Sequence, residues 1–330
     1  MWRHVVRAAG LALGLACASC TASGSSPAPP PAASAGSAVI TVGSFDFPES
    51  ELLAYLYADA LSARGYAVRV LPDLGSRELV EPALMTGLIQ LVPEYTGSAL
   101  EFVSLGRVHA TASVATTAGN LQRWMGERGI IVAQPAAAQD ANAIVVTAAT
   151  AARYRLRTVS DLIAVAPSLV FGGPPECPER PYCLQGLRRV YGLRFRAFAG
   201  LDTGGTLTRQ ALEGGEISAA LLFTTDPAIR GRHLVVLADN RGLQPAENVV
   251  PVLRRATAER YGTGLVAALD AVSARLSTPA LMALDAQVEL DGLSPNVVAE
   301  RWLRDQGLTP PGRGPWPRDQ RMTRPGQGPS

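Results

Sequence analysis

Short apolar runs alternate with longer amphipathic segments from residue 39 onward. Residues 39–42 are apolar and β-branched, and residues 49–64 carry leucine and alanine at helical spacing. The alternation of strand and helix patterns continues over 68–70, 78–86, 88–92, 142–147, 168–171, 184–191, 194–198, 206–213 and 217–222. Three further helical patterns follow, over 257–276, 278–284 and 295–305. This rhythm predicts an α/β protein with parallel-rich sheets.

One segment of the chain is echoed by a later one. Ala83-Leu84, Gly87, Ile89, Tyr95 and Thr96 recur at a constant offset as Ala211-Leu212, Gly215, Ile217, Phe223 and Thr224. Each copy reads as a helix, a glycine stop, a strand and an aromatic-threonine pair. Because ligands of open parallel sheets bind beyond the carboxyl ends of the strands, the echo predicts equivalent ring positions in two similar lobes, both facing one cleft.

Both ends of the chain lack the composition of a packed core. Residues 1–20 combine a basic head, a short apolar run and a small-residue exit with cysteine, which is typical of a lipoprotein signal peptide. We expect lipid on Cys20, with Cys17 as the alternative; a cleaved signal without lipid is the third possibility. Residues 21–38 contain only Thr, Ala, Ser, Gly, Pro and predict a flexible tether, and residues 309–330 predict a disordered tail.

Charge and cysteine content reduce the number of possible classes of function. The net charge of +2 gives no electrostatic footprint for nucleic acid. Apart from the two N-terminal cysteines, only Cys177 and Cys183 remain, and in an exported protein this spacing favours a local disulfide. The sequence contains no phosphate-binding loop, metal-ligand cluster or nucleophile elbow. We therefore expect no metal, no cofactor and no catalysis.

Five segments carry a resemblance to a known family. Residues 43–50, Gly-Ser-Phe-Asp-Phe-Pro-Glu-Ser, resemble an opening Gly-Ser-Lys-Asp-Phe-Thr-Glu-Gln motif, and residues 93–98, Pro-Glu-Tyr-Thr-Gly-Ser, resemble the signature Pro-Glu-Tyr-Thr-Gly-Thr. Residues 223–226, 159–162 and 235–239 also fit, in the expected order. The family is that of the glycine betaine, choline and osmoprotectant-binding proteins of ABC importers.

The resemblance implies a two-lobed clamp of the periplasmic-binding-protein type II class. Lobe 1 would comprise residues 39–141 plus 246–308, and lobe 2 residues 142–245. The protein would be a monomer held by its lipid on the extracytoplasmic face of the cell membrane. It would capture a small quaternary amine or zwitterion and deliver it to an ABC permease with its ATPase.

The resemblance also implies the site residues. A quaternary ammonium has no donor protons, so aromatic faces hold it by cation–π attraction, here Tyr95 and Phe223. Ser50 and Ser98 would help to hold a ligand carboxylate. Ser44 and Thr224 belong to the matched motifs and complete the expected site, together with the two residues at which the family's pattern is broken, Asn142 and Arg209. Both replace expected tyrosines, and an arginine facing the cleft would repel a quaternary cation.

Two other classes of function remain open at this point. A ligand sensor or interaction protein could reuse the same clamp without transport. An unrecognised hydrolase is the third class, since Asp202-Thr203-Gly204 resembles an aspartic-protease triplet. The chain has no second triplet of this kind, which makes a turn the better interpretation.

Overall fold

The computed structural model describes residues 39–231 and 233–309. The predicted signal peptide, Cys17, Cys20 and the tether at 21–38 lie outside these residues, as does the predicted tail from residue 310. Thr309, which we placed in that tail, is described and buried. In the described part of the chain no single helix is long and apolar enough to cross a bilayer. Only α10 (Thr263–Ser273) and α11 (Thr278–Glu289), taken as a pair bent by 85°, meet that length and composition.

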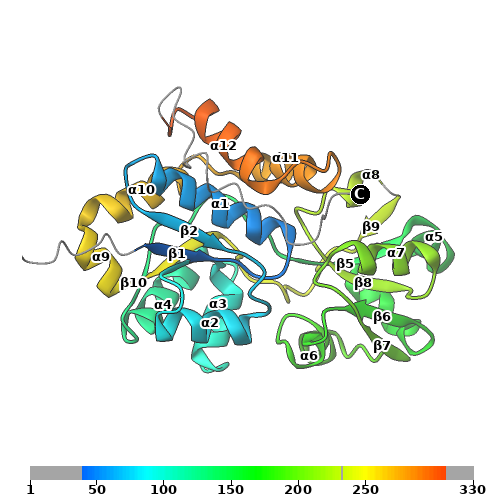
Figure 1. Ribbon diagram of the computed structural model, residues 1–330. Coiled ribbons are helices and arrows are strands. Elements are labelled where there is room, and N and C mark those ends of the chain that lie inside the picture. The colour runs from blue at the N-terminus through cyan, green and yellow to red at the C-terminus, as the bar shows by residue number, and fades with distance from the viewer. Residues whose placement is uncertain (1–38, 232, 310–330) are drawn as a thin grey trace, which may run out of the picture. The chain divides into compact units, whose positions relative to one another are not determined.

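Lobe 1 is built on a five-stranded sheet in the order β2-β1-β3-β10-β4. Figure 1 labels three of these strands, β1, β2 and β10. The strands are β1 (Ile40–Gly43), β2 (Val68–Leu71), β3 (Leu91–Tyr95), β4 (Ile130–Val132) and β10 (Val249–Arg254). β1 pairs in parallel with β2 and β3, whereas β10 runs antiparallel between β3 and β4. The strand that completes this sheet therefore comes from much later in the sequence than its neighbours.

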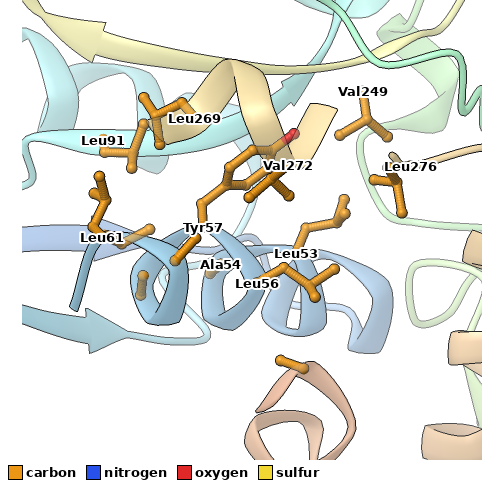
Figure 2. Close-up of a cluster of buried hydrophobic side chains, with 14 of the residues drawn as sticks. Leu53, Ala54, Leu56, Tyr57, Leu61, Leu91, Val249, Leu269, Val272 and Leu276 are labelled. Carbon is orange, nitrogen blue, oxygen red and sulfur yellow. The ribbon is translucent and has the colours of Figure 1, made fainter. Parts of the chain in front are cut away.

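Helices cover both faces of the lobe 1 sheet (Figure 1). They are α1 (Pro48–Ser62), α2 (Arg77–Thr86), α3 (Thr96–Ser104), α4 (Val114–Gly126), α9 (Arg255–Tyr261), α10 (Thr263–Ser273), α11 (Thr278–Glu289) and α12 (Pro295–Asp305). On one face α1 packs with α10, α11 and α12 around the fully buried Tyr57 (Figure 2). The Tyr57 hydroxyl lies 3.0 Å from Ser273 Oγ. On the other face α2, α3 and α4 form a second core around Leu84 and Leu121.

Lobe 2 repeats the arrangement with a second sheet in the order β7-β6-β8-β5-β9. The strands are β5 (Asn142–Thr147), β6 (Val170–Gly173), β7 (Ala197–Gly200), β8 (Ala219–Phe223) and β9 (Leu234–Val236). The helices are α5 (Ala148–Tyr154), η1 (Val159–Ala164), η2 (Ala166–Ser168), η3 (Cys177–Glu179), α6 (Leu184–Gly186), η4 (Leu187–Tyr191), α7 (Thr206–Gly214) and α8 (Ala228–Gly231). β5 is antiparallel to β8 and β9, as β10 is to its neighbours in lobe 1.

Two segments join the lobes, one on each side of residues 142–236, and they are bonded to each other. Gln139 and Asn248 form an antiparallel bridge, and the Asp140 amide donates to the Glu247 carbonyl at 3.0 Å. On the lobe 2 side the amide of Thr224 donates to the carbonyl of Ala141 at 2.9 Å. Hydrogen bonds therefore hold the two crossing segments to each other and to the end of β8 in lobe 2.

The two-lobed α/β prediction is confirmed, with differences in the individual elements. The strand predicted at 88–92 lies at Leu91–Tyr95, because Gly87 ends α2 with a left-handed φ of 87° and three residues are spent in the turn. The helical pattern at 257–276 is two helices, divided at Gly262, whose φ of 80° a continuous helix cannot contain. In lobe 1, the helices α3 and α4 and the strands β4 and β10 were not predicted.

Candidate functional site

A cavity of about 550 Å³ has walls from both lobes. Six aromatic side chains line it: Phe45, Phe47, Tyr95, Phe102, Tyr182 and Phe223. Rings from both lobes therefore face one space, which is the arrangement that cation–π binding requires.

Phe47 lies at the centre of a cluster of four of these rings. Its ring centroid is 5.9 Å from that of Phe45, 6.2 Å from that of Tyr95 and 5.4 Å from that of Phe223. Phe47 therefore adds a third ring to the two predicted ones, and it lies beside both Tyr95 and Phe223. Phe47 comes from the loop between β1 and α1. It belongs to the motif at residues 43–50, whose serines, Ser44 and Ser50, are the predicted ligand residues.

The echo in the sequence corresponds to a structural repeat. Tyr95 is the last residue of β3 and Phe223 is the last residue of β8, and each strand is third in its sheet. Gly87 and Gly215 end the preceding helices with left-handed φ angles of 87° and 78°. The two rings thus reach the cavity from equivalent strand ends, as the echo predicts.

Acidic side chains outnumber basic ones in the cavity wall. The carboxylates are Asp46, Glu78, Glu101, Asp140, Glu176, Glu179 and Glu247, and the guanidiniums are Arg77, Arg180 and Arg189. Arg77 Nε and Nη2 donate to the two oxygens of the buried Glu94 at 2.8 Å each, so its charge is balanced within lobe 1. Burial raises the pKa of Asp140 and Glu247, so five of the seven carboxyls count as full charges. Five against three guanidiniums still favour a cationic occupant.

A buried group of carboxyls lies behind the rings. Glu49 accepts from the Tyr95 hydroxyl at 2.5 Å and from the Thr225 hydroxyl of lobe 2 at 2.7 Å. Burial raises the pKa of Glu49, and burial together with the Glu49 charge raises the pKa of Asp140 and Asp285 well above the ordinary value. The bond between Thr225 and Glu49 therefore joins lobe 2 to lobe 1 at this buried group.

Two of the predicted ligand residues other than the rings line the cavity, and both are already engaged. The Ser98 hydroxyl donates to Glu247 Oε1 at 2.6 Å. The Asn142 side-chain amide donates to the Tyr182 carbonyl at 3.2 Å. The Ser98 hydroxyl proton and one amide proton of Asn142 are thus directed at the protein, whereas the resemblance gives Ser98 a ligand carboxylate.

The other predicted residues lie outside the cavity lining. Ser44 Oγ accepts from the Asp73 amide and Ser50 Oγ accepts from the Phe45 amide, so both serines shape the loop that carries Phe47. Thr224 donates to Asp140 at the crossing point between the lobes.

Arg209 does not face the cavity as we expected. Its Nη1 lies 3.1 Å from Asp226 and 2.7 Å from Glu289, and the side chain is buried. Glu289 belongs to lobe 1 and Arg209 to lobe 2, so this pair is a contact between the lobes. The arginine therefore carries no argument against a cationic ligand.

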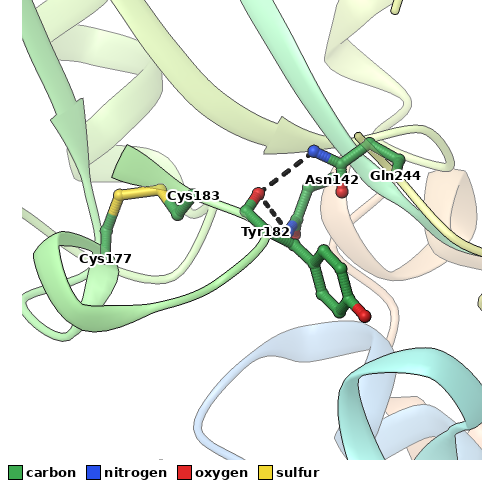
Figure 3. Close-up of a disulfide and its surroundings, with 5 residues drawn as sticks. All are labelled: Asn142, Cys177, Tyr182, Cys183 and Gln244. Carbon is green, nitrogen blue, oxygen red and sulfur yellow. Dashed lines mark hydrogen bonds between the residues drawn. A yellow bond between two sulfur atoms is a disulfide. The ribbon is translucent and has the colours of Figure 1, made fainter. Parts of the chain in front are cut away.

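A short loop of lobe 2, residues 177–183, crosses to lobe 1. Cys177 and Cys183 are joined in a disulfide at its base (Figure 3). Arg180 donates to Glu78 at 2.7 Å, and the Tyr182 hydroxyl donates to Glu101 at 3.0 Å. The Tyr182 carbonyl also accepts from Asn142 and from Gln244, as Figure 3 shows. The loop therefore links the cavity wall, the crossing segments and the opposite lobe.

Sequence reasoning missed Phe45, Phe47, Phe102, Tyr182 and Glu247 as cavity residues. The two first phenylalanines stood in a motif already recognised, and Tyr182 stood between the two cysteines. No signal in the sequence marks Phe102 or Glu247, because both reach the cavity only through long-range contacts.

Two lobes of this topology, joined by two crossing segments around a shared cavity, define a two-lobed solute-binding protein. The chain belongs to the family described as the substrate binding domain of ABC-type glycine betaine transport systems, whose model matches residues 38–305. Members of this family bind a substrate for transport and are not enzymes, so the expectation of binding without catalysis is confirmed.

Known proteins of similar sequence and fold agree with this assignment. A glycine-betaine-binding protein of Pseudomonas aeruginosa is 27% identical over 91% of this chain and 95% of its own length. The glycine betaine-binding protein YehZ of Escherichia coli is 25% identical over 82% of this chain and 91% of its own. The crystal structure of a glycine betaine/carnitine/choline ABC transporter protein superposes with a TM-score of 0.65, at 21% identity, over 82% of this chain and 99% of that one.

Proposed function

We propose that this protein captures a small quaternary amine between its lobes and delivers it to the permease of an ABC importer. The observation that carries the proposal is one cavity lined by six aromatic rings and an excess of carboxylates. Rings hold a methylated ammonium by its charge, and the carboxylates make the surrounding potential favourable. The names of the relatives, which include glycine betaine, choline and carnitine, support the same class of ligand.

The proposal extends to the cell surface. The N-terminal pattern ending at Cys20, or alternatively Cys17, supports export and a lipid anchor on the extracytoplasmic face. Residues 21–38 would then tether the clamp beside the permease. A monomer satisfies this arrangement, since both lobes of one chain supply the cavity.

The ligand class can be tested with choline and its neutral isostere 3,3-dimethyl-1-butanol, in which a carbon replaces the nitrogen. Calorimetric titration should give choline an affinity at least about tenfold higher, because each ring contributes roughly 0.5 to 2 kcal/mol only to a cation. Equal affinity for the two compounds, or no binding of choline, glycine betaine or carnitine, would contradict the proposal.

Leucine variants locate the cation. Phe47→Leu and Phe223→Leu keep much of the apolar volume but remove the ring, so choline should bind about three- to tenfold more weakly while the isostere is unaffected. Phe198→Leu is the matched control, because Phe198 is a half-buried ring of β7 in lobe 2 outside the cavity. A loss in Phe198→Leu equal to that in Phe223→Leu would place the effect on folding and not on the site.

A further inference from the structure

The N-terminus of α3 opens onto the cavity and presents three donors. They are the backbone amides of Gly97 and Ser98 and the hydroxyl of Ser98. Unpaired amides at a helix N-terminus, with the helix dipole behind them, attract a carboxylate. A ligand with a carboxylate would find this donor group in the same cavity as the aromatic rings.

A side chain of the protein already fills this position. Glu247 Oε2 accepts from the amides of Gly97 and Ser98 at 2.9 and 3.0 Å, and Oε1 accepts from the Ser98 hydroxyl at 2.6 Å. The carboxyl comes from the crossing segment before β10, is 3% exposed and lines the cavity. Gly97 makes the close fit possible, since a Cβ there would lie 2.8 Å from the Ala246 carbonyl and 3.0 Å from Glu247 Oε1.

The three arginines of the cavity wall offer a ligand carboxylate no equivalent of the α3 donors that Glu247 occupies. Arg77 is held by both oxygens of Glu94, and Arg180 donates to Glu78. Arg189 lines the cavity but is largely exposed. A ligand carboxylate in this cavity would therefore meet a surplus of negative charge and a donor group that is already saturated.

We infer that Glu247 is a specificity-determining residue, whose carboxylate stands where a zwitterion's carboxylate would bind and so selects quaternary cations without an acidic group. The inference rests on the proposed function, because it divides quaternary amines into two charge classes. Cations such as choline are the favoured class and zwitterions such as glycine betaine are the disfavoured one.

A matched pair of ligands tests this inference. Glycine betaine and its amide differ only in whether the end opposite the ammonium is charged. In calorimetric titration at pH 8 the wild-type protein should bind the amide at least about tenfold more tightly than betaine, because a desolvated like-charge contact is costly. The ratio of the two affinities is read on one protein sample, so a partly unfolded fraction affects both values equally.

Two variants of Glu247 should change that ratio. Glu247→Gln removes the charge with little change in shape, and Glu247→Ala also vacates the donors of α3. The ratio should fall about tenfold in both, and betaine should gain most in Glu247→Ala. Glu179→Gln is the matched control, since it removes one charge from an exposed residue of the same wall.

Three results would overturn the inference. Betaine could bind the wild type as tightly as its amide, with the affinity lost in Arg189→Ala, which would place the ligand carboxylate on Arg189. Glu179→Gln could lower the ratio as much as Glu247→Gln, which would make the effect one of total charge. Both Glu247 variants could keep the wild-type ratio while folded, as judged by circular dichroism. In all three cases the ligands bind and the proposed function stands; if neither betaine nor its amide binds the wild type, the proposed function itself fails.

Discussion

Removal of one hydroxyl, in Tyr182→Phe, should weaken ligand binding without unfolding the protein. Tyr182 is on the disulfide loop of lobe 2, and its hydroxyl donates at 3.0 Å to Glu101 of α3 in lobe 1. Both residues are buried, with exposed fractions of 7% and 5%. Burial and the neighbouring Glu101 raise the pKa of Tyr182, so the hydroxyl keeps its proton at every assay pH. We therefore expect this bond to form when the clamp closes and to break when it opens.

The magnitude follows from the partners of Glu101. A hydrogen bond to a charged group contributes roughly 1.5 to 3 kcal/mol, and a carboxylate left with no partner would cost more. Glu101 also lies 3.1 Å from His109 Nδ1, so it retains one partner after the substitution. The lower end of the range therefore applies. About 1.5 kcal/mol corresponds to a Kd raised by roughly tenfold.

Stopped-flow kinetics with the ligand found by calorimetry give the sharpest assay. The dissociation rate should rise about tenfold and the association rate should change less than about twofold, because the bond forms after the ligand has entered. Tyr57→Phe is the matched control, because it removes a hydroxyl buried beside Ser273 in the core of lobe 1. This variant should lower the free energy of unfolding by about 1 kcal/mol and leave the Kd for the ligand unchanged. Wild-type affinity in a folded Tyr182→Phe variant, or a loss confined to the association rate, would refute the reasoning.

Three further predictions concern stability and processing. Burial raises the pKa of Glu247 to about 7, so the folded protein holds this proton more tightly than the unfolded chain does. The free energy of unfolding should therefore fall by about 3 kcal/mol as the pH rises from about 4.5 to 7. Denaturant unfolding of Glu247→Gln should lack this pH-dependent loss, and parallel pH profiles of the variant and the wild type would contradict the prediction. A nonreducing digest analysed by mass spectrometry should show Cys177 linked to Cys183, and two free thiols in protein purified from an oxidising compartment would argue against the bond. Labelled fatty acid should enter the wild type and not Cys20→Ala; labelling lost only in Cys17→Ala would move the anchor to that residue.

The periodic pattern of the sequence predicts most of lobe 1 and lobe 2, because their strands and helices each bury a regular apolar face. It fails where a boundary depends on backbone conformation, as at Gly262, which divides one apolar pattern into two helices. The pattern also fails for β10. Its residues are mostly apolar, but no predicted helix precedes them, so the strand-helix-strand pattern that marks a parallel crossover is missing. A strand that pairs antiparallel in the middle of a parallel sheet can be recognised only from its partners.

The cavity was less predictable than the fold. Tyr95 and Phe223 were found from the echo, since equivalent strand ends must place their side chains alike. Arg209 shows why the sequence predicted polar side chains in the cavity that the structure places elsewhere. The sequence shows its charge but not Asp226 and Glu289, which lie 17 and 80 positions further along the chain and neutralise it.

The late position of β10 has a consequence for the order of folding. Without residues 249–254 the first sheet has only β2, β1 and β3 paired, and β4 has no partner strand in it. Lobe 2, in contrast, takes all five strands from the continuous stretch 142–236. Lobe 2 can therefore complete its sheet while the sheet of lobe 1 is still unfinished, although β1 of lobe 1 precedes lobe 2 in the sequence. Pairing across more than 100 residues also carries a large loop-closure cost, which makes it slow. Hydrogen exchange measured during refolding should accordingly protect β5 and β8 before β3 and β10 acquire protection together.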